Sequence, residues 1–147
     1  MLNDVVILMA EDDEGHAYLV KRNLERAGIT NQIEHFKNGE EILSFLNELT
    51  DEDQNKNKSF LILLDIRMPR VDGIEVLKKI KENSLLKTIP VIMLTTTNNP
   101  QEIKLCHSLG CSNYITKPIE YEKFVETIRR LGLFMRIVEI PELQPSA

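Results

Sequence analysis

Carboxylates, hydroxyls and one amine stand directly after apolar runs of the sequence. The acidic residues 11–13 (Glu-Asp-Asp) follow one run, and Asp65 follows another. Three threonines at 95–97 follow a third run, and Lys117 follows a shorter one. Neighbouring carboxylates repel one another unless a cation lies among them, and such hard oxygen ligands suit Mg²⁺. A carboxylate can also act as a nucleophile and form an aspartyl phosphate, so these residue types suit magnesium-assisted phosphoryl transfer.

The apolar runs predict strands that are covered on both faces. The three strongest runs are rich in branched side chains and are continuously apolar, without the alternation of a half-exposed strand. Such runs are typical of a parallel sheet. Two weaker runs complete the set. The predicted strands span residues 5–10, 32–36, 60–64, 91–94 and 113–116.

A helical pattern follows every predicted strand. Ala17, Val20 and Leu24 recur at spacings of three and four, and Gly28 suits the position just past a helix end. Pro100 suits the first position of a later helix. Five strand–helix units predict an α/β fold with a parallel sheet and helices on both faces. Ligands of such sheets bind beyond the carboxyl ends of the strands, where the polar residues described above converge.

Four segments carry a resemblance to a known family. Residues 7–13, residues 63–73, residues 90–95 and residues 114–118 are similar to the receiver domains of two-component systems, in order and at strand ends. The similarity spans about residues 5 to 131. The resemblance implies a flavodoxin-like, doubly wound (βα)5 fold with strand order 2-1-3-4-5. It also implies a receiver domain at residues 4–132 and a short C-terminal extension at residues 133–147.

The resemblance assigns a metal site and a phosphoacceptor. Asp65 would accept the phosphoryl group from a sensor histidine kinase. Asp12 and Asp65 would bind Mg²⁺ directly, together with the backbone carbonyl of Arg67, and Glu11 would act mostly through a metal-bound water.

The same resemblance assigns a switch. Thr95 and Lys117 would contact the phosphoryl oxygens, and Tyr114 would be an aromatic switch coupled to Thr95. The bond between Lys117 and Pro118 would be cis, an isomer that is essentially confined to proline. Phosphorylation would then bias an existing two-state equilibrium.

Three positions would tune the lifetime of the phosphorylated state: Arg67, Thr96 and Thr97. Thr96 stands where a smaller residue is frequent in the family, and Arg67 could reach over the site as a salt-bridge partner.

A second resemblance covers the whole chain and points to a narrower group of receivers. Tyr18, residues 94–97 and residues 138–141 are similar to stand-alone receivers that serve phytochrome-type histidine kinases, especially in cyanobacteria.

Composition argues against several other classes of protein. The formal net charge is −5, and no basic cluster indicates direct nucleic-acid binding. No apolar run approaches the roughly 18 residues of a membrane helix, and the first residues lack the features of a secretory signal, so we expect a cytoplasmic protein. Cys106 and Cys111 are spaced neither as a redox pair nor as metal ligands.

Only 16 residues follow Leu131, so the output is expected to be a contact with a downstream protein or a phosphotransfer protein. We expect a homodimer through residues 100–131, with Ile103, Leu105 and Phe124 as apolar contacts. The fifth helix is expected to end near Gly132, and residues 135–140 could add a short strand or a dimer contact.

Other interpretations stay open at the level of sequence. The chain could be a receiver-like adaptor that works without phosphorylation, or a phosphatase of the haloacid dehalogenase type. The latter would need Asp-x-Asp after the first strand, where this chain has Glu-Asp-Asp, and a cap insertion. Asp65 could be a simple helix cap, residues 11–13 could be a charged turn before a helix, and Tyr114 could be ordinary core packing. We interpret none of the scattered His16, His35 and His107 as a phosphodonor, and we expect a surface role for His16.

Overall fold

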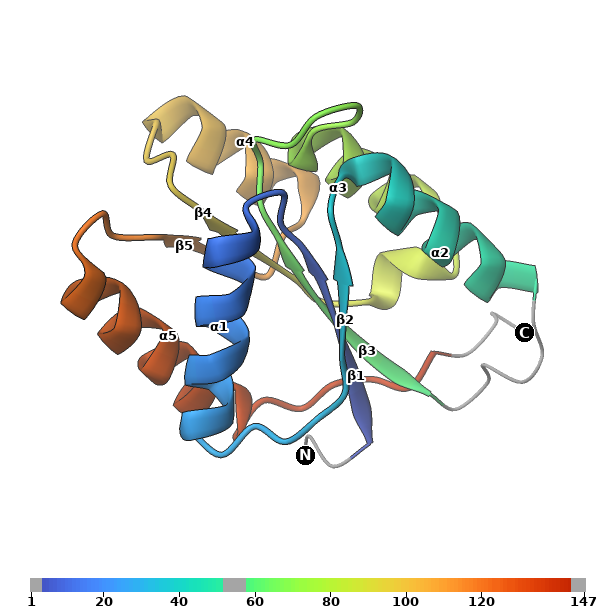
Figure 1. The fold of residues 1–147 in the computed structure, drawn as a ribbon. Helices are drawn as coiled ribbons and strands as arrows, with labels where there is room; N and C mark the ends of the chain where they lie inside the picture. The colour runs from blue at the N-terminus through green and yellow to red at the C-terminus, as the bar shows by residue number, and fades with distance from the viewer. Residues whose placement is uncertain (1–3, 52–57, 144–147) are drawn as a thin grey trace.

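The computed structural model describes residues 4–51 and 58–143 (Figure 1). Strands and helices alternate along the chain, with one added 3-10 helix, η2. The elements are β1 (Val5–Ala10), α1 (Glu14–Arg26), β2 (Ile33–Phe36), α2 (Gly39–Asp51), β3 (Ser59–Leu64), α3 (Gly73–Glu82), η2 (Leu86–Thr88), β4 (Val91–Thr95), α4 (Pro100–Leu109), β5 (Asn113–Thr116) and α5 (Tyr121–Met135).

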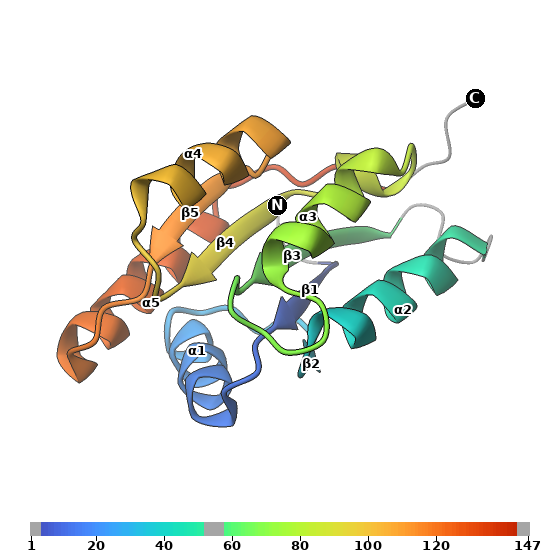
Figure 2. The same ribbon diagram turned by 90° about the horizontal axis from the view of Figure 1, so that it is seen from above.

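The sheet is parallel, and its strand order is β2-β1-β3-β4-β5. The expected fold class and strand order are therefore confirmed. Helices α1 and α5 cover one face, and α2, α3 and α4 cover the other (Figure 2). Side chains alternate along each strand between the two core layers, so central strands are apolar at almost every position.

Local signals define both ends of α4, and the predicted start at Pro100 is confirmed. Asn99 caps α4 through a hydrogen bond from the amide of Gln101 at 2.8 Å, and Pro100 is the first residue of that helix. Gly110 ends α4 in the left-handed conformation, with φ of 103°. No helix in the described part of the chain is long and apolar enough to cross a membrane.

The C-terminal part differs from the expectation in two ways. Helix α5 does not end near Gly132 but continues to Met135. Gly132 is buried, and a Cβ there would lie 2.6 Å from the Cβ of Ala27. The glycine therefore permits the close packing of two segments and does not terminate the helix.

Residues 135–140 form no strand. The chain instead crosses beneath the sheet toward the start of β3 (Figure 1). Glu142 makes an isolated antiparallel bridge with Ser59, and the amide of Leu143 donates to the carbonyl of Lys58 at 2.6 Å. Leu143 is 3% exposed in the core beneath α2 and α3, so burial of this side chain helps to hold the segment against the domain. The remainder of the expected extension, residues 144–147, lies outside the described residues.

Candidate functional site

Four polar side chains meet at the carboxyl edge of the sheet, as predicted. Glu11 follows β1, Asp65 follows β3, Thr95 ends β4 and Lys117 follows β5. Their backbones continue the strand ladder: the amide of Glu11 donates to Phe36, that of Asp65 to Ala10, and that of Lys117 to Thr95. All four are buried, each with 7% or less of its surface exposed. Burying polar and charged groups costs free energy, and such groups gather at functional sites, so their grouping marks this edge as the candidate site.

Three carboxylates of this edge could hold a cation. One ligand oxygen from each of Glu11, Asp12 and Asp65 lies within 4.8 Å of the others. Glu11 and Asp65 are buried, whereas Asp12 is exposed, which leaves one side of the position open to water or phosphate oxygens. An all-oxygen set of few protein ligands fits Mg²⁺ or a similar hard divalent ion. The backbone carbonyl of Arg67 remains a predicted ligand.

Lys117 bridges the two buried carboxylates. Its Nζ donates to Oε1 of Glu11 and lies 3.4 Å from Oδ2 of Asp65. The pKa of Glu11 is raised to about 8 despite the nearby Lys117. Burial is the largest cause, and hydrogen bonding to Asp65 is the next. Burial also pushes the pKa of Asp65 upward, but hydrogen bonding to Glu11 and the charge of Lys117 outweigh it and hold the pKa below its usual value.

The Thr95 hydroxyl lies at the same edge of the sheet. It is fully buried, and its Oγ1 forms no hydrogen bond of normal geometry with the residues that the structure describes, although its proximity helps to lower the pKa of Asp65. Asp65 uses Oδ1 to accept from the amide of Ile66 at 2.7 Å. A buried hydroxyl without a partner costs roughly 1–3 kcal/mol, and a phosphoryl oxygen bound on Asp65 would relieve that cost.

The loop that carries Asp65 is held closely against the start of α3. The amide of Gly73 donates to the carbonyl of Ile66 at 2.8 Å. A Cβ on Gly73 would lie 2.0 Å from the carbonyl oxygen of Asp65, so only glycine fits there. Asp72 caps α3 by accepting from the amide of Glu75. The sequence pattern at residues 72–73 therefore positions the loop.

Tyr114 contacts the segment that follows β4. Its hydroxyl donates to the carbonyl of Thr97 at 2.8 Å, and its ring is half-buried against the core. Burial raises the pKa of Tyr114 to about 12. Coupling between Tyr114 and Thr95 remains a prediction.

Arg67 turns toward α4 and pairs with Glu102 at 2.8 Å, so its salt bridge leads away from the buried carboxylates. Among the other predicted tuning positions, Thr96 is exposed and Thr97 is half-buried.

The expected cis bond before Pro118 is wrong: all peptide bonds in the described ranges are trans. The trans isomer is the favoured one. Lys117 reaches Glu11 and Asp65 with it, because the bond from its amide to Thr95 already directs the side chain inward.

Two residues lie elsewhere than the sequence suggested. His16 is at the site, with Nδ1 3.2 Å from Nζ of Lys117, and not simply at the surface. Its place in the first turn of the helix that follows the acidic residues 11–13 is the signal that could have indicated this. Phe124 is 4% exposed and packs against His16, so it cannot be a surface contact of a dimer.

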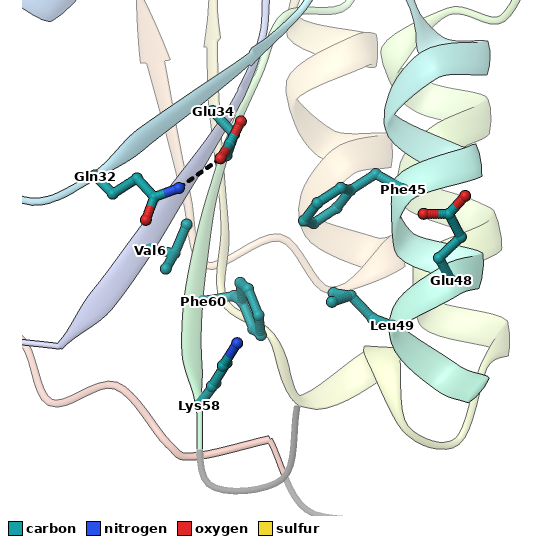
Figure 3. A pocket seen from close by; sticks show the side chains of 8 residues that line it. All are labelled: Val6, Gln32, Glu34, Phe45, Glu48, Leu49, Lys58 and Phe60. Carbon is teal, nitrogen blue, oxygen red and sulfur yellow. Dashed lines mark hydrogen bonds between the residues drawn. The ribbon is translucent and has the colours of Figure 1, made fainter. Parts of the chain in front are cut away.

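A separate pocket of about 210 Å³ lies at the opposite end of the sheet (Figure 3). Val6 and Phe60, near the starts of β1 and β3, form one wall, and Phe45 and Leu49 of α2 form another. The pocket therefore lies away from Asp65 and belongs to no part of the site described above.

Comparisons with known proteins agree with this geometry. The family model of the response regulator receiver domain matches residues 7–129. A crystal structure of a response regulator receiver domain from Rhodospirillum rubrum has a TM-score of 0.86 and 42% identity, covering 95% of this chain and 99% of that one.

Two further relatives are cyanobacterial. Response regulator Rcp1 of Synechocystis sp. is 32% identical over 137 residues, which is 92% of each chain. Its Mn²⁺-bound crystal structure has a TM-score of 0.78 at 30% identity, covering 92% of this chain and 98% of that one. The phosphorylated cyanobacterial phytochrome response regulator RcpA has a TM-score of 0.82 at 28% identity, covering 92% and 97%. With the family model matched over most of its length, this chain belongs to the response regulator receiver family.

Proposed function

We propose that Asp65 accepts a phosphoryl group from a sensor histidine kinase in a Mg²⁺-dependent reaction. One observation carries the proposal: the oxygens of Glu11, Asp12 and Asp65 gather within 4.8 Å, beside the buried ammonium of Lys117. Such a cluster supplies the two needs of phosphoryl transfer, which are a positioned nucleophile and neutralisation of charge.

The protein's own residues divide the work. A carboxylate oxygen of Asp65 bonds to phosphorus as the phosphorus–nitrogen bond of a phosphohistidine breaks, and the leaving imidazole takes up a proton. Lys117 and the hydroxyl of Thr95 bind oxygens of the transferred group. Glu11, Asp12, Asp65 and the carbonyl of Arg67 would hold Mg²⁺, which supplies additional charge neutralisation when bound.

We also propose that the phosphorylated state is transmitted through the face formed by α4, β5 and α5. Movement of Thr95 toward the phosphoryl group would also move Tyr114. The hydroxyl of Tyr114 already bonds to the segment before α4. Ile103 lines an apolar hollow on α4, and Leu105 is 39% exposed. This face would bind a downstream protein or a phosphotransfer protein, or pair two copies of the chain with help from residues 133–137.

The similarity to the phytochrome response regulator RcpA supports a phytochrome-type kinase as the donor. The haloacid dehalogenase interpretation is not favoured, since the matched family is that of receivers. A phosphorylation-independent adaptor remains the alternative outcome of the test below.

The test is the intact mass of the chain after incubation with phosphoramidate or acetyl phosphate. Wild type with Mg²⁺ should gain one phosphoryl group, and Asp65→Asn should gain none. Wild type treated with a chelator should react far more slowly. If wild type gained no phosphoryl group with any divalent metal, the phosphorylation-independent adaptor would be favoured instead.

A further inference from the structure

His16 reaches the buried amine of the site from the first turn of α1. Its Nδ1 lies 3.2 Å from Nζ of Lys117 and 3.6 Å from Oε1 of Glu11. The other side of the imidazole packs against Phe124 of α5, with ring centroids 5.5 Å apart. The roles proposed above leave this histidine unused.

The chemistry of Lys117 defines what His16 does. A lysine ammonium has three donors and no acceptor. Here its neighbours are an oxygen of Glu11, an oxygen of Asp65 and Nδ1 of His16. Because the ammonium can only donate, Nδ1 must be the acceptor and must carry no proton, which places the ring proton on Nε2. The 3.6 Å separation from Glu11 is too long for a hydrogen bond, and that oxygen already accepts from Lys117.

We propose that His16 is a positioning residue that holds the ammonium of Lys117 toward Asp65. The inference deepens the proposed function and rests on it. During phosphorylation, Lys117 must exchange a carboxylate oxygen of Asp65 for a phosphoryl oxygen. The bond to His16 keeps Nζ in place through that exchange. Without this acceptor, Lys117 would turn further toward Glu11, its closer carboxylate partner, and would stabilise the transferred group less well.

Two substitutions separate this role from packing. His16→Leu keeps an apolar contact with Phe124 but removes the acceptor, whereas the side-chain oxygen of His16→Asn can replace Nδ1. With Mg²⁺ and phosphoramidate, we expect His16→Leu to phosphorylate about tenfold more slowly at saturating donor and His16→Asn to stay within about twofold of wild type. The donor concentration at half-saturation should not change. A packing role predicts the reverse order, so Asn slower than Leu, or Leu equal to wild type, would overturn the proposal.

Matched controls and a second measurement complete the test. His107 lies on the exposed face of α4, and His107→Leu and His107→Asn should both react like wild type. Long-range ¹H–¹⁵N spectra of the histidine rings at neutral pH need no phosphorylation. They should show His16 protonated on Nε2 and not on Nδ1. If wild type takes up no phosphoryl group, the proposed function fails. The spectra then decide the role of His16 by themselves, and a proton on Nδ1 would overturn it.

Discussion

The backbone amide of Lys117 donates a hydrogen bond to the carbonyl oxygen of Thr95 at 2.7 Å. This bond extends the pairing of β4 with β5 by one residue beyond the partners Thr95 and Thr116. The two buried side chains proposed to bind phosphoryl oxygens are therefore held in fixed register. Their functional groups can change partners while the strands stay where they are.

Lys117→Ala should slow the reaction of Asp65 without abolishing it, and it should uncouple the reaction from the shape change. The buried carboxylates would lose the cation between them, which we expect to lower the free energy of unfolding by about 3 kcal/mol. Amide spectra of residues 97–131, recorded with and without phosphoramidate, should shift in wild type and not in the variant. Lys123→Ala removes an exposed lysine of α5 and is the control. Phosphorylation-dependent shifts like those of wild type in Lys117→Ala would contradict the coupling role.

Mg²⁺ should stabilise the folded chain by binding to the acidic cluster, and the gain should rise with the logarithm of the metal concentration above Kd. A metal concentration one hundred times Kd would add about 2.7 kcal/mol to the free energy of unfolding. Asp12→Asn should weaken this effect, as measured by thermal unfolding across a Mg²⁺ titration. Asp13→Asn is the matched control, because Asp13 caps α1 by accepting from the amide of His16 and lies outside the cluster. Equal loss of metal response in both variants would contradict the site.

Gly73→Ala should disrupt the loop that carries Asp65. The added Cβ would lie 2.0 Å from the carbonyl oxygen of Asp65, which is backbone and cannot easily move aside. We expect a loss of about 3 kcal/mol in the free energy of unfolding in urea. Gly15→Ala, where the nearest atom is a flexible side chain, should change stability by less than about 1 kcal/mol. Similar values for the two variants would show that the loop adapts freely.

Leu143→Ala should destabilise the chain although the residue lies near the end of the sequence. The buried side chain fills part of the core beneath α2 and α3, so its loss should cost about 2–4 kcal/mol in urea unfolding. Ile137→Ala serves as the control, because Ile137 is 75% exposed and should have little effect. If Leu143→Ala were no more costly than Ile137→Ala, the packing of the C-terminal segment would be wrong.

The sequence predicts much of the sheet and the site because both depend on local signals. Continuous apolar runs indicate the central strands, and Glu11, Asp65 and Lys117 follow those strands directly. The sequence does not predict the contact between His16 and Lys117, since a single histidine on a helix gives no indication of a partner more than one hundred residues away.

The C-terminal segment shows a different limit. Glycine is a residue type that often ends a helix. At Gly132, however, the missing side chain permits close packing against Ala27. Leu143 is an ordinary residue in the sequence, and only the three-dimensional core reveals the space that it fills.

Location of the phosphoryl group tests the central claim most directly. Borohydride reduces an aspartyl phosphate to homoserine, which fragment mass spectra can place at one residue. After reaction with phosphoramidate and Mg²⁺, we predict homoserine at position 65 and at no other aspartate, including Asp12 and Asp13. Reduction at another aspartate, or a phosphoryl group that stays on the chain in Asp65→Asn, would contradict the account.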